Sequence, residues 1–269
     1  MNFGLAVSTF PTSFGPIMFS GDLARRMNEL ASLGYAGIDL FIRRVDEPGL
    51  DEVVAAIQRS KLKVALLAAV SAFVDEGLFL SSPDFQVRTV LLARMKNQVR
   101  LAASLGASVP IGLLRGREGG VERLKLLADS LFELNRFAGP LGVKLVLEPV
   151  NRYETQLINT VQQAVDFLED FGLPSLGLLP DVFHMNIEES CIEDAILLAG
   201  SRIAHVHFAD SNRRVPGQGH IHWQNIFLAL RQAGYAGFCT LEAIPGPDPL
   251  RDARQALAFL NHTLITCNS

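Results

Sequence analysis

Short apolar runs recur along the whole chain, and longer stretches with helical spacing separate them. The runs are rich in Val, Leu, Ile and Phe, which is typical of buried strands. Eight such runs cover residues 2–8, 37–42, 63–69, 108–114, 143–149, 176–181, 203–209 and 237–244. The clearest helical stretch covers residues 85–105, where apolar residues recur every three or four positions. The pattern therefore predicts alternating strands and helices.

Glycines support this alternation, because they follow helical stretches at points where a left-handed C-cap precedes a strand: Gly34, Gly106, Gly142 and Gly234. Eight strand–helix units with continuously apolar strands predict a parallel sheet that is covered by helices and closed into a barrel. We therefore expect one (β/α)8 TIM barrel domain, class α/β, over residues 1–269. The alternative is an open doubly wound sheet, but no G-x-G-x-x-G turn follows an early strand.

Composition and charge narrow the possible partners. The chain of 269 residues is 49% hydrophobic and 19% charged, which is enough apolar material for a large core. A net charge of −4 with scattered Lys and Arg argues against a nucleic acid partner. The chain shows neither a leader peptide nor a long apolar span, so we expect a cytoplasmic protein without membrane contact. Its three cysteines have no metal or redox spacing and are expected to be reduced.

Four ionisable residues stand at the ends of the last four predicted strands: Glu148, Asp181, His207 and Glu242. In a TIM barrel these ends form one face, where the catalytic groups lie. A single strand-end carboxylate can equally be a salt bridge or a helix cap, but three converging carboxylates repel one another unless a cation joins them. The sequence therefore predicts a divalent metal site. Its oxygen-rich ligands suit Mn²⁺ first, with Co²⁺ or Mg²⁺ as alternatives.

The histidines limit the type of metal chemistry. All six follow residue 183, so the early strands cannot supply the ligands of a multinuclear zinc site such as that of endonucleases acting at abasic DNA. His205 precedes His207 by two positions, so both point into the barrel, and we expect His205 to be packed or to orient a ligand. His220, His222 and Trp223 are expected to shape a loop.

Four segments resemble the D-tagatose 3-epimerase family of ketose 3-epimerases, which includes D-psicose (allulose) and L-ribulose 3-epimerases. They are LEPVNRYET, PDVFHMNIEE, HVHFADSNRRVPGQGHIHW and TLEAI. The resemblance implies a xylose-isomerase-like barrel, the same four metal ligands, and a homo-oligomer, either dimer or tetramer. It also implies that Glu154, His184 and Arg213 contact the sugar substrate. A surface ion pair is the alternative for Glu154 and Arg213, and a helix cap for His184.

The expected activity is isomerisation of a sugar, with inversion of C3 in a free ketose such as L-ribulose, D-tagatose, D-psicose or D-fructose. Glu148 and Glu242 would flank the reacting carbon, one removing its proton to give a cis-enediolate and the other returning a proton to the opposite face. An aldose–ketose isomerase such as hydroxypyruvate isomerase is an alternative. A catalytically silent sugar-binding barrel is a second alternative, which the paired glutamates disfavour.

Two features set this chain apart from the family pattern. The first strand carries Ala6 and Val7 where the family commonly has an aromatic residue beside the sugar. The loop after the fourth strand carries Arg115 and Arg117, which resembles a related branch that epimerises keto-uronates such as 5-keto-L-gluconate. Guanidinium groups at this rim would clamp a sugar carboxylate, so a keto-uronate is the alternative substrate.

Overall fold

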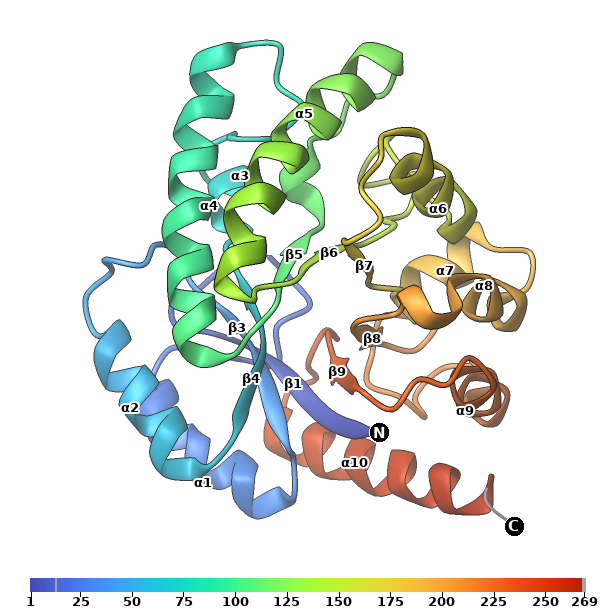
Figure 1. Ribbon diagram of the computed structural model, residues 1–269. Coiled ribbons are helices and arrows are strands. Elements are labelled where there is room, and N and C mark those ends of the chain that lie inside the picture. Colours follow the sequence, from blue (N-terminus) through green and yellow to red (C-terminus); the bar gives the residue numbers. More distant parts are fainter. Residues whose placement is uncertain (13, 268–269) are drawn as a thin grey trace.

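The computed structural model describes residues 1–12 and 14–267, and its strands form a closed barrel inside a ring of helices (Figure 1). The eight barrel strands are β1 (Asn2–Ser8), β3 (Gly37–Phe41), β4 (Lys63–Ala68), β5 (Val109–Ile111), β6 (Leu145–Leu147), β7 (Gly177–Leu178), β8 (Val206–Phe208) and β9 (Phe238–Leu241). Each lies within one of the eight predicted runs, so the (β/α)8 prediction is confirmed. β1 has the predicted bounds, and the other seven strands are shorter than the predicted runs.

Two parallel sheets make up the barrel. One has the order β4-β3-β1-β9-β8, and the other has the order β5-β6-β7. The sheets meet at two seams that isolated bridges close. Leu66 pairs with Ser108 at the seam between β4 and β5, while Leu178 pairs with Ile203 and Asp181 with His207 between β7 and β8. Continuous pairing therefore joins the strands within each sheet, whereas isolated bridges join the two sheets.

The helices that cover the barrel are α1 (Leu23–Leu33), α2 (Leu50–Ser60), α3 (Ser71–Val74), α4 (Phe85–Leu105), α5 (Val121–Ala138), α6 (Val161–Asp170), α7 (Val182–Glu188), α8 (Ile192–Ala199), α9 (Trp223–Gln232) and α10 (Pro249–Thr266). Helix α4 has the predicted bounds. Gly34 and Gly106 end α1 and α4 with φ values of 101° and 67°, the left-handed conformation that their positions predicted. No helix of the described residues is long and apolar enough to cross a membrane.

Two local features differ from the predicted pattern. The run 108–114 leaves the sheet after Ile111, and Leu113–Arg115 form a 3₁₀ turn, η1, in which the Arg115 side chain binds main-chain carbonyls. A short strand, β2 (Phe19–Ser20), adds to the edge of β1 through the pairs Val7–Phe19 and Ser8–Ser20. Both features lie at the carboxyl ends of the strands, where loops rather than the sheet determine the shape.

Side chains alternate between two environments along each strand. Outward residues such as Leu145 and Leu147 of β6 join the large core between barrel and helices. Inward residues form a small separate cluster of Leu66, Val146 and Leu179. Beside this apolar layer the barrel interior becomes polar, and there the candidate site begins.

Candidate active site

The four predicted metal ligands lie together at the carboxyl ends of β6 to β9. Glu148 follows β6, Asp181 caps the first turn of α7 after β7, His207 lies in β8 and Glu242 follows β9. All four are buried, and one ligand atom of each lies within 4.8 Å of those of the others. Parallel strands that end at the same edge bring these residues together although they span nearly a hundred positions of sequence.

His207 stands at the centre of this cluster. Its Nδ1 lies 3.3 Å from Glu148 Oε1, 3.7 Å from Glu242 Oε2 and 4.0 Å from Asp181 Oδ2. Asp181 Oδ1 accepts the main-chain N–H of Phe183 at 2.8 Å, but its Oδ2 is buried without a hydrogen-bond partner. An unsatisfied buried carboxylate oxygen is costly, and a cation among these donors would satisfy it. Three carboxylates and one imidazole therefore fit a divalent ion that prefers oxygen ligands.

The pKa values report how crowded the buried charges are. Burial raises the pKa of Asp181 to about 7 and that of Glu242 well above its usual range. Burial alone would lower the pKa of His207, but Glu242, Asp39 and Glu148 outweigh it and hold that pKa well above its usual value. The cluster carries more negative charge than one imidazole neutralises, so protons and a metal ion compete for the same atoms.

Asp39, which was not among the predicted site residues, supports the cluster from inside the barrel. It lies fully buried in β3, and its Oδ2 accepts Nε2–H of His207 at 3.2 Å, Nε2–H of His205 at 3.0 Å and the hydroxyl of Thr240. Its Oδ1 accepts the N–H of Leu66 at 3.1 Å. Since Nε2 of His207 is engaged, Nδ1 faces the other ligands. The overlooked signal was a carboxylate in the middle of an apolar strand.

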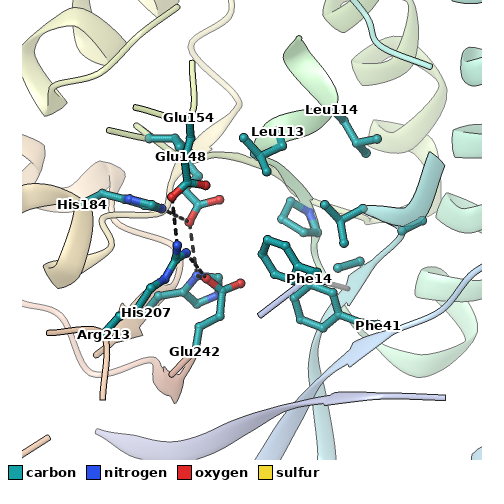
Figure 2. A pocket seen from close by; sticks show the side chains of 16 residues that line it. Phe14, Phe41, Leu113, Leu114, Glu148, Glu154, His184, His207, Arg213 and Glu242 are labelled. Carbon is teal, nitrogen blue, oxygen red and sulfur yellow. Dashed lines mark hydrogen bonds and ion pairs between the residues drawn. The ribbon is translucent and has the colours of Figure 1, made fainter. Parts of the chain in front are cut away.

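The three predicted substrate contacts, Glu154, His184 and Arg213, line one cavity with Glu148, His207 and Glu242 (Figure 2). The cavity has an empty volume of about 480 Å³. The wall across from His184 and Arg213 is apolar and includes Phe14, Phe41, Leu113 and Leu114 (Figure 2). Phe14 stacks on Phe41 with ring centroids 5.8 Å apart, so the loop after β1 supplies the aromatic wall that β1 itself lacks.

Arg213 and Glu154 form an ion pair inside this cavity rather than on the surface. Arg213 Nη1 lies 2.9 Å from Glu154 Oε1, and Nη2 lies 3.6 Å from Glu242 Oε2. The guanidinium carbon lies 4.6 Å from the ring centre of Phe183. Nε and Nη2 of Arg213 are buried without hydrogen-bond partners. These N–H groups are free to bind an oxygen-rich ligand beside Glu242.

The loop that carries Arg213 is held by one buried carboxylate, that of Asp210. Its Oδ2 accepts the N–H of Gly217 at 2.8 Å and the indole N–H of Trp223 at 3.0 Å, and its Oδ1 accepts the N–H of Ile221 at 3.1 Å. Arg213 itself has a φ of 60°, a left-handed conformation that non-glycine residues rarely adopt. Asp210 thus fixes an otherwise unfavourable turn. Trp223 contributes to that loop, as predicted.

His184 lies in α7 beside the ligand cluster. Burial lowers its pKa to about 3, so the ring is neutral. Its Nε2 lies 3.7 Å from Asp181 Oδ2 and 4.0 Å from Glu148 Oε1. Asp181, not His184, caps α7. The side chain of His184 therefore lies at the cavity. It does not cap the helix, which was the alternative that the sequence left open.

The expectation that Arg115 clamps a substrate carboxylate is wrong. The side chain is fully buried, and it donates hydrogen bonds to the main-chain carbonyls of Gly112, Leu157, Ile158 and Glu148. Burial lowers the pKa of this guanidinium to about 10. These hydrogen bonds join the turn after β5 to the chain after β6. The sequence could place the guanidinium at the rim but could not tell that it turns inward.

Arg117 also lies apart from the residues that line the cavity. Its side chain is exposed, and its guanidinium carbon lies 5.6 Å from the ring centre of Phe73, whereas the cavity described above is lined by other residues. His220 and His222 line a different hollow with Cys191. These residues therefore do not contribute to the arrangement around His207.

Known proteins resemble this chain in fold and in sequence. The xylose isomerase-like TIM barrel family matches residues 27–262. The D-psicose 3-epimerase of Agrobacterium fabrum is 32% identical over 231 residues, 80% of this chain and 77% of that protein. The 3-dehydro-D-guloside 4-epimerase of Escherichia coli is 35% identical over 137 residues, 51% of this chain and 52% of that protein. A solved L-ribulose 3-epimerase structure superposes with a TM-score of 0.84 at 26% identity, covering 99% of this chain and 95% of that one.

The chain belongs to the xylose isomerase-like TIM barrel family, in the group that contains the ketose 3-epimerases, and it is an isomerase.

Proposed function

We propose that the protein inverts C3 of a free ketose with the help of one divalent ion held by Glu148, Asp181, His207 and Glu242. The observation that carries this proposal is the pair of glutamates. Glu148 and Glu242 come from β6 and β9, on either side of the strands that carry the other two ligands, and both line the same cavity (Figure 2). Two carboxylates on different sides of one substrate position are what an epimerisation requires.

Inverting a carbon beside a carbonyl takes two proton transfers on opposite faces. One glutamate removes the proton from C3, and the other returns a proton to the other face of the enediolate. Each such transfer is worth about 10² to 10⁴ in rate as general acid–base catalysis. A bound ion would polarise the carbonyl and stabilise the enediolate charge; Mn²⁺ is our first choice, with Co²⁺ or Mg²⁺ as alternatives.

The remaining polar residues would orient the sugar. Arg213 and His184 line the cavity and would hold oxygens next to the reacting carbon, while Glu154 would accept a hydroxyl. Among the described residues lining the cavity, Arg213 is the single Lys or Arg, and Glu154 already pairs with it. This charge balance favours a neutral ketose over a keto-uronate.

Inversion at C4 of a 3-keto sugar is a second candidate. It is favoured by the similarity to the 3-dehydro-D-guloside 4-epimerase, which is 35% identical over 137 residues. Chemically, C4 is also next to the carbonyl in such a substrate, so the same two glutamates would act on it. The two activities differ only in which carbon the pocket places between the carboxylates.

Deuterium exchange separates these possibilities. The Mn²⁺-loaded protein is incubated in D2O with neutral pentuloses and hexuloses, keto-uronates and 3-keto sugars, and NMR locates the incorporated deuterium. We expect label at C3 together with the C3 epimer of a neutral ketose. Label at C4 would assign the second activity, and an aldose product without a C3 epimer would refute epimerisation.

The acid–base pair is tested with Glu242→Gln, with Glu133→Gln on the exposed face of α5 as the matched control. We expect sugar binding to persist in Glu242→Gln while inversion at C3 falls by about 10²-fold or more. The metal content of both variants is measured, since Glu242 is also a proposed ligand. Unchanged epimerisation in the metal-loaded variant would remove Glu242 from the mechanism.

A further inference from the structure

Asn151 lies in the loop after β6, behind the cavity wall, and makes three side-chain hydrogen bonds. It is 2% exposed and does not line the cavity. Its Oδ1 accepts the main-chain N–H of Tyr153 at 3.0 Å. Its Nδ2 lies 3.1 Å from Glu154 Oε1 and 2.7 Å from His184 Nδ1. One amide thus joins two of the residues that line the cavity.

The partners fix which way this amide points. The main-chain N–H of Tyr153 only donates, so the amide oxygen must face it. Glu154 is a carboxylate that also accepts a hydrogen bond from Arg213 at 2.9 Å, so it needs the amide nitrogen. The second N–H of Asn151 is then directed at His184 Nδ1, which must accept it.

A neutral imidazole has one protonated and one unprotonated nitrogen. Since Nδ1 of His184 accepts the short bond from Asn151, the proton resides on Nε2. That nitrogen belongs to the part of the ring that faces the cavity, near Asp181 Oδ2 and Glu148 Oε1. His184 therefore presents a hydrogen-bond donor to the site rather than a lone pair.

We propose that Asn151 is a positioning residue that holds His184 in the Nε2–H tautomer, and so makes His184 a donor to the substrate oxygen next to the reacting carbon. The tautomer follows from the protein alone, whereas its use in catalysis rests on the proposed epimerase function. Negative charge grows on that oxygen as the C3 proton leaves. A donor aimed at such an oxygen is worth about 10²- to 10³-fold in kcat.

The inference is tested by the tautomer itself and by Asn151→Asp. Long-range ¹H–¹⁵N spectra of the Mg²⁺-loaded protein, in which the ion is diamagnetic, distinguish protonated from unprotonated ring nitrogens. The chain has only 6 histidines, and loss of one signal set in His184→Asn assigns His184. We expect Nε2–H in the wild type. In Asn151→Asp the carboxylate accepts from the ring, so we expect Nδ1–H, and kcat falls about 10²-fold.

Two controls accompany this variant. The tautomer of His205, whose Nε2 lies against Asp39 and Thr240, should not change. Asn135→Asp, on α5, can still accept the hydroxyl of Ser175 and should leave both the His184 tautomer and kcat unchanged. Asn151→Ala removes the donor without adding charge beside Glu154, and we expect a mixture of both tautomers.

The outcomes separate the two proposals. A wild-type Nδ1–H tautomer, or a His184 tautomer that both Asn151 variants leave unchanged, would overturn the role of Asn151. If the wild type shows Nε2–H and the variants shift it, but no ketose is epimerised, the positioning of His184 stands and the proposed function fails.

Discussion

Replacing Asp39 by Asn should weaken metal binding without altering any proposed ligand. Four donors converge on this carboxylate: Nε2–H of His207 and of His205, the hydroxyl of Thr240 and the N–H of Leu66. Asparagine has the same shape, but one of its two polar atoms is a donor. At least one of the four donors then faces an NH2 group, and His207 loses the charged partner that keeps its Nδ1 directed at the other ligands.

The expected loss of metal affinity follows from the role of Asp39 as the hydrogen-bond partner of a proposed metal ligand. Loss of a carboxylate that orients a metal-binding histidine typically costs about 10- to 100-fold in metal affinity. This corresponds to about 1.4 to 2.7 kcal/mol of binding free energy. Asp39 has no solvent to replace its charge, since it is fully buried, so we expect a value toward the upper end.

Isothermal titration of the metal-free protein with Mn²⁺ measures this affinity directly. Asp129→Asn, on the exposed side of α5, is the matched control and should bind Mn²⁺ like the wild type. Circular dichroism shows whether each variant is folded. A folded Asp39→Asn protein that binds Mn²⁺ as tightly as the wild type would refute the reasoning that Asp39 orients His207.

Three further outcomes are expected. Affinity for Mn²⁺ should fall by about tenfold per pH unit as the pH drops below about 7. The reason is that burial raises the pKa of Asp181 to about 7, and its proton must leave before the metal binds. An Mn²⁺ affinity that stays constant between pH 6 and 8 would contradict this. Arg115→Met should lower the free energy of unfolding, measured in urea, by about 3 kcal/mol, since several buried carbonyls lose their donor. The ratio of the rates with neutral ketoses and with keto-uronates should stay unchanged. A selective loss of activity on keto-uronates would show that Arg115 does bind a substrate carboxylate. Asp210→Ala should raise KM by releasing the loop that carries Arg213 while Mn²⁺ affinity is retained, and an unaltered KM would show that the loop holds itself.

The sequence was sufficient for the barrel because each strand and helix repeats a simple periodicity. The strand runs and the helix at residues 85–105 follow from alternating burial, and glycines mark where helices end. What could not be predicted were the places where segments at the carboxyl ends of the strands depart from the regular pattern. Residues 113–115 form a 3₁₀ turn in which Arg115 is buried, and Phe19–Ser20 pair with the end of β1. Neither event leaves a periodic signal.

The same distinction applies to the site. Glu148 and Glu242 were predictable because acids at the ends of apolar strands are unusual and the fold brings strand ends together. Asp39 and Asn151 were not proposed, since their importance lies in the atoms they contact and not in where they stand. From the sequence alone, a carboxylate inside a predicted strand can be a buried hydrogen-bond partner or an exposed residue. Only its contacts, such as that of Asp39 with His205, decide between the two.

The seam between β7 and β8 gives the ion a mechanical role besides its chemistry. The seam is joined by the pairs Leu178–Ile203 and Asp181–His207, and the second of these connects two proposed ligands. Glu148 and Asp181 belong to the side of the barrel built by β5–β7, while His207 and Glu242 belong to the other sheet. A bound ion would therefore hold the two sheets together at a seam that isolated bridges, and not a continuous ladder, join. Stripping it should loosen the barrel first along this line, so that amide exchange near residues 178–181 and 203–207 accelerates before the rest of the fold responds.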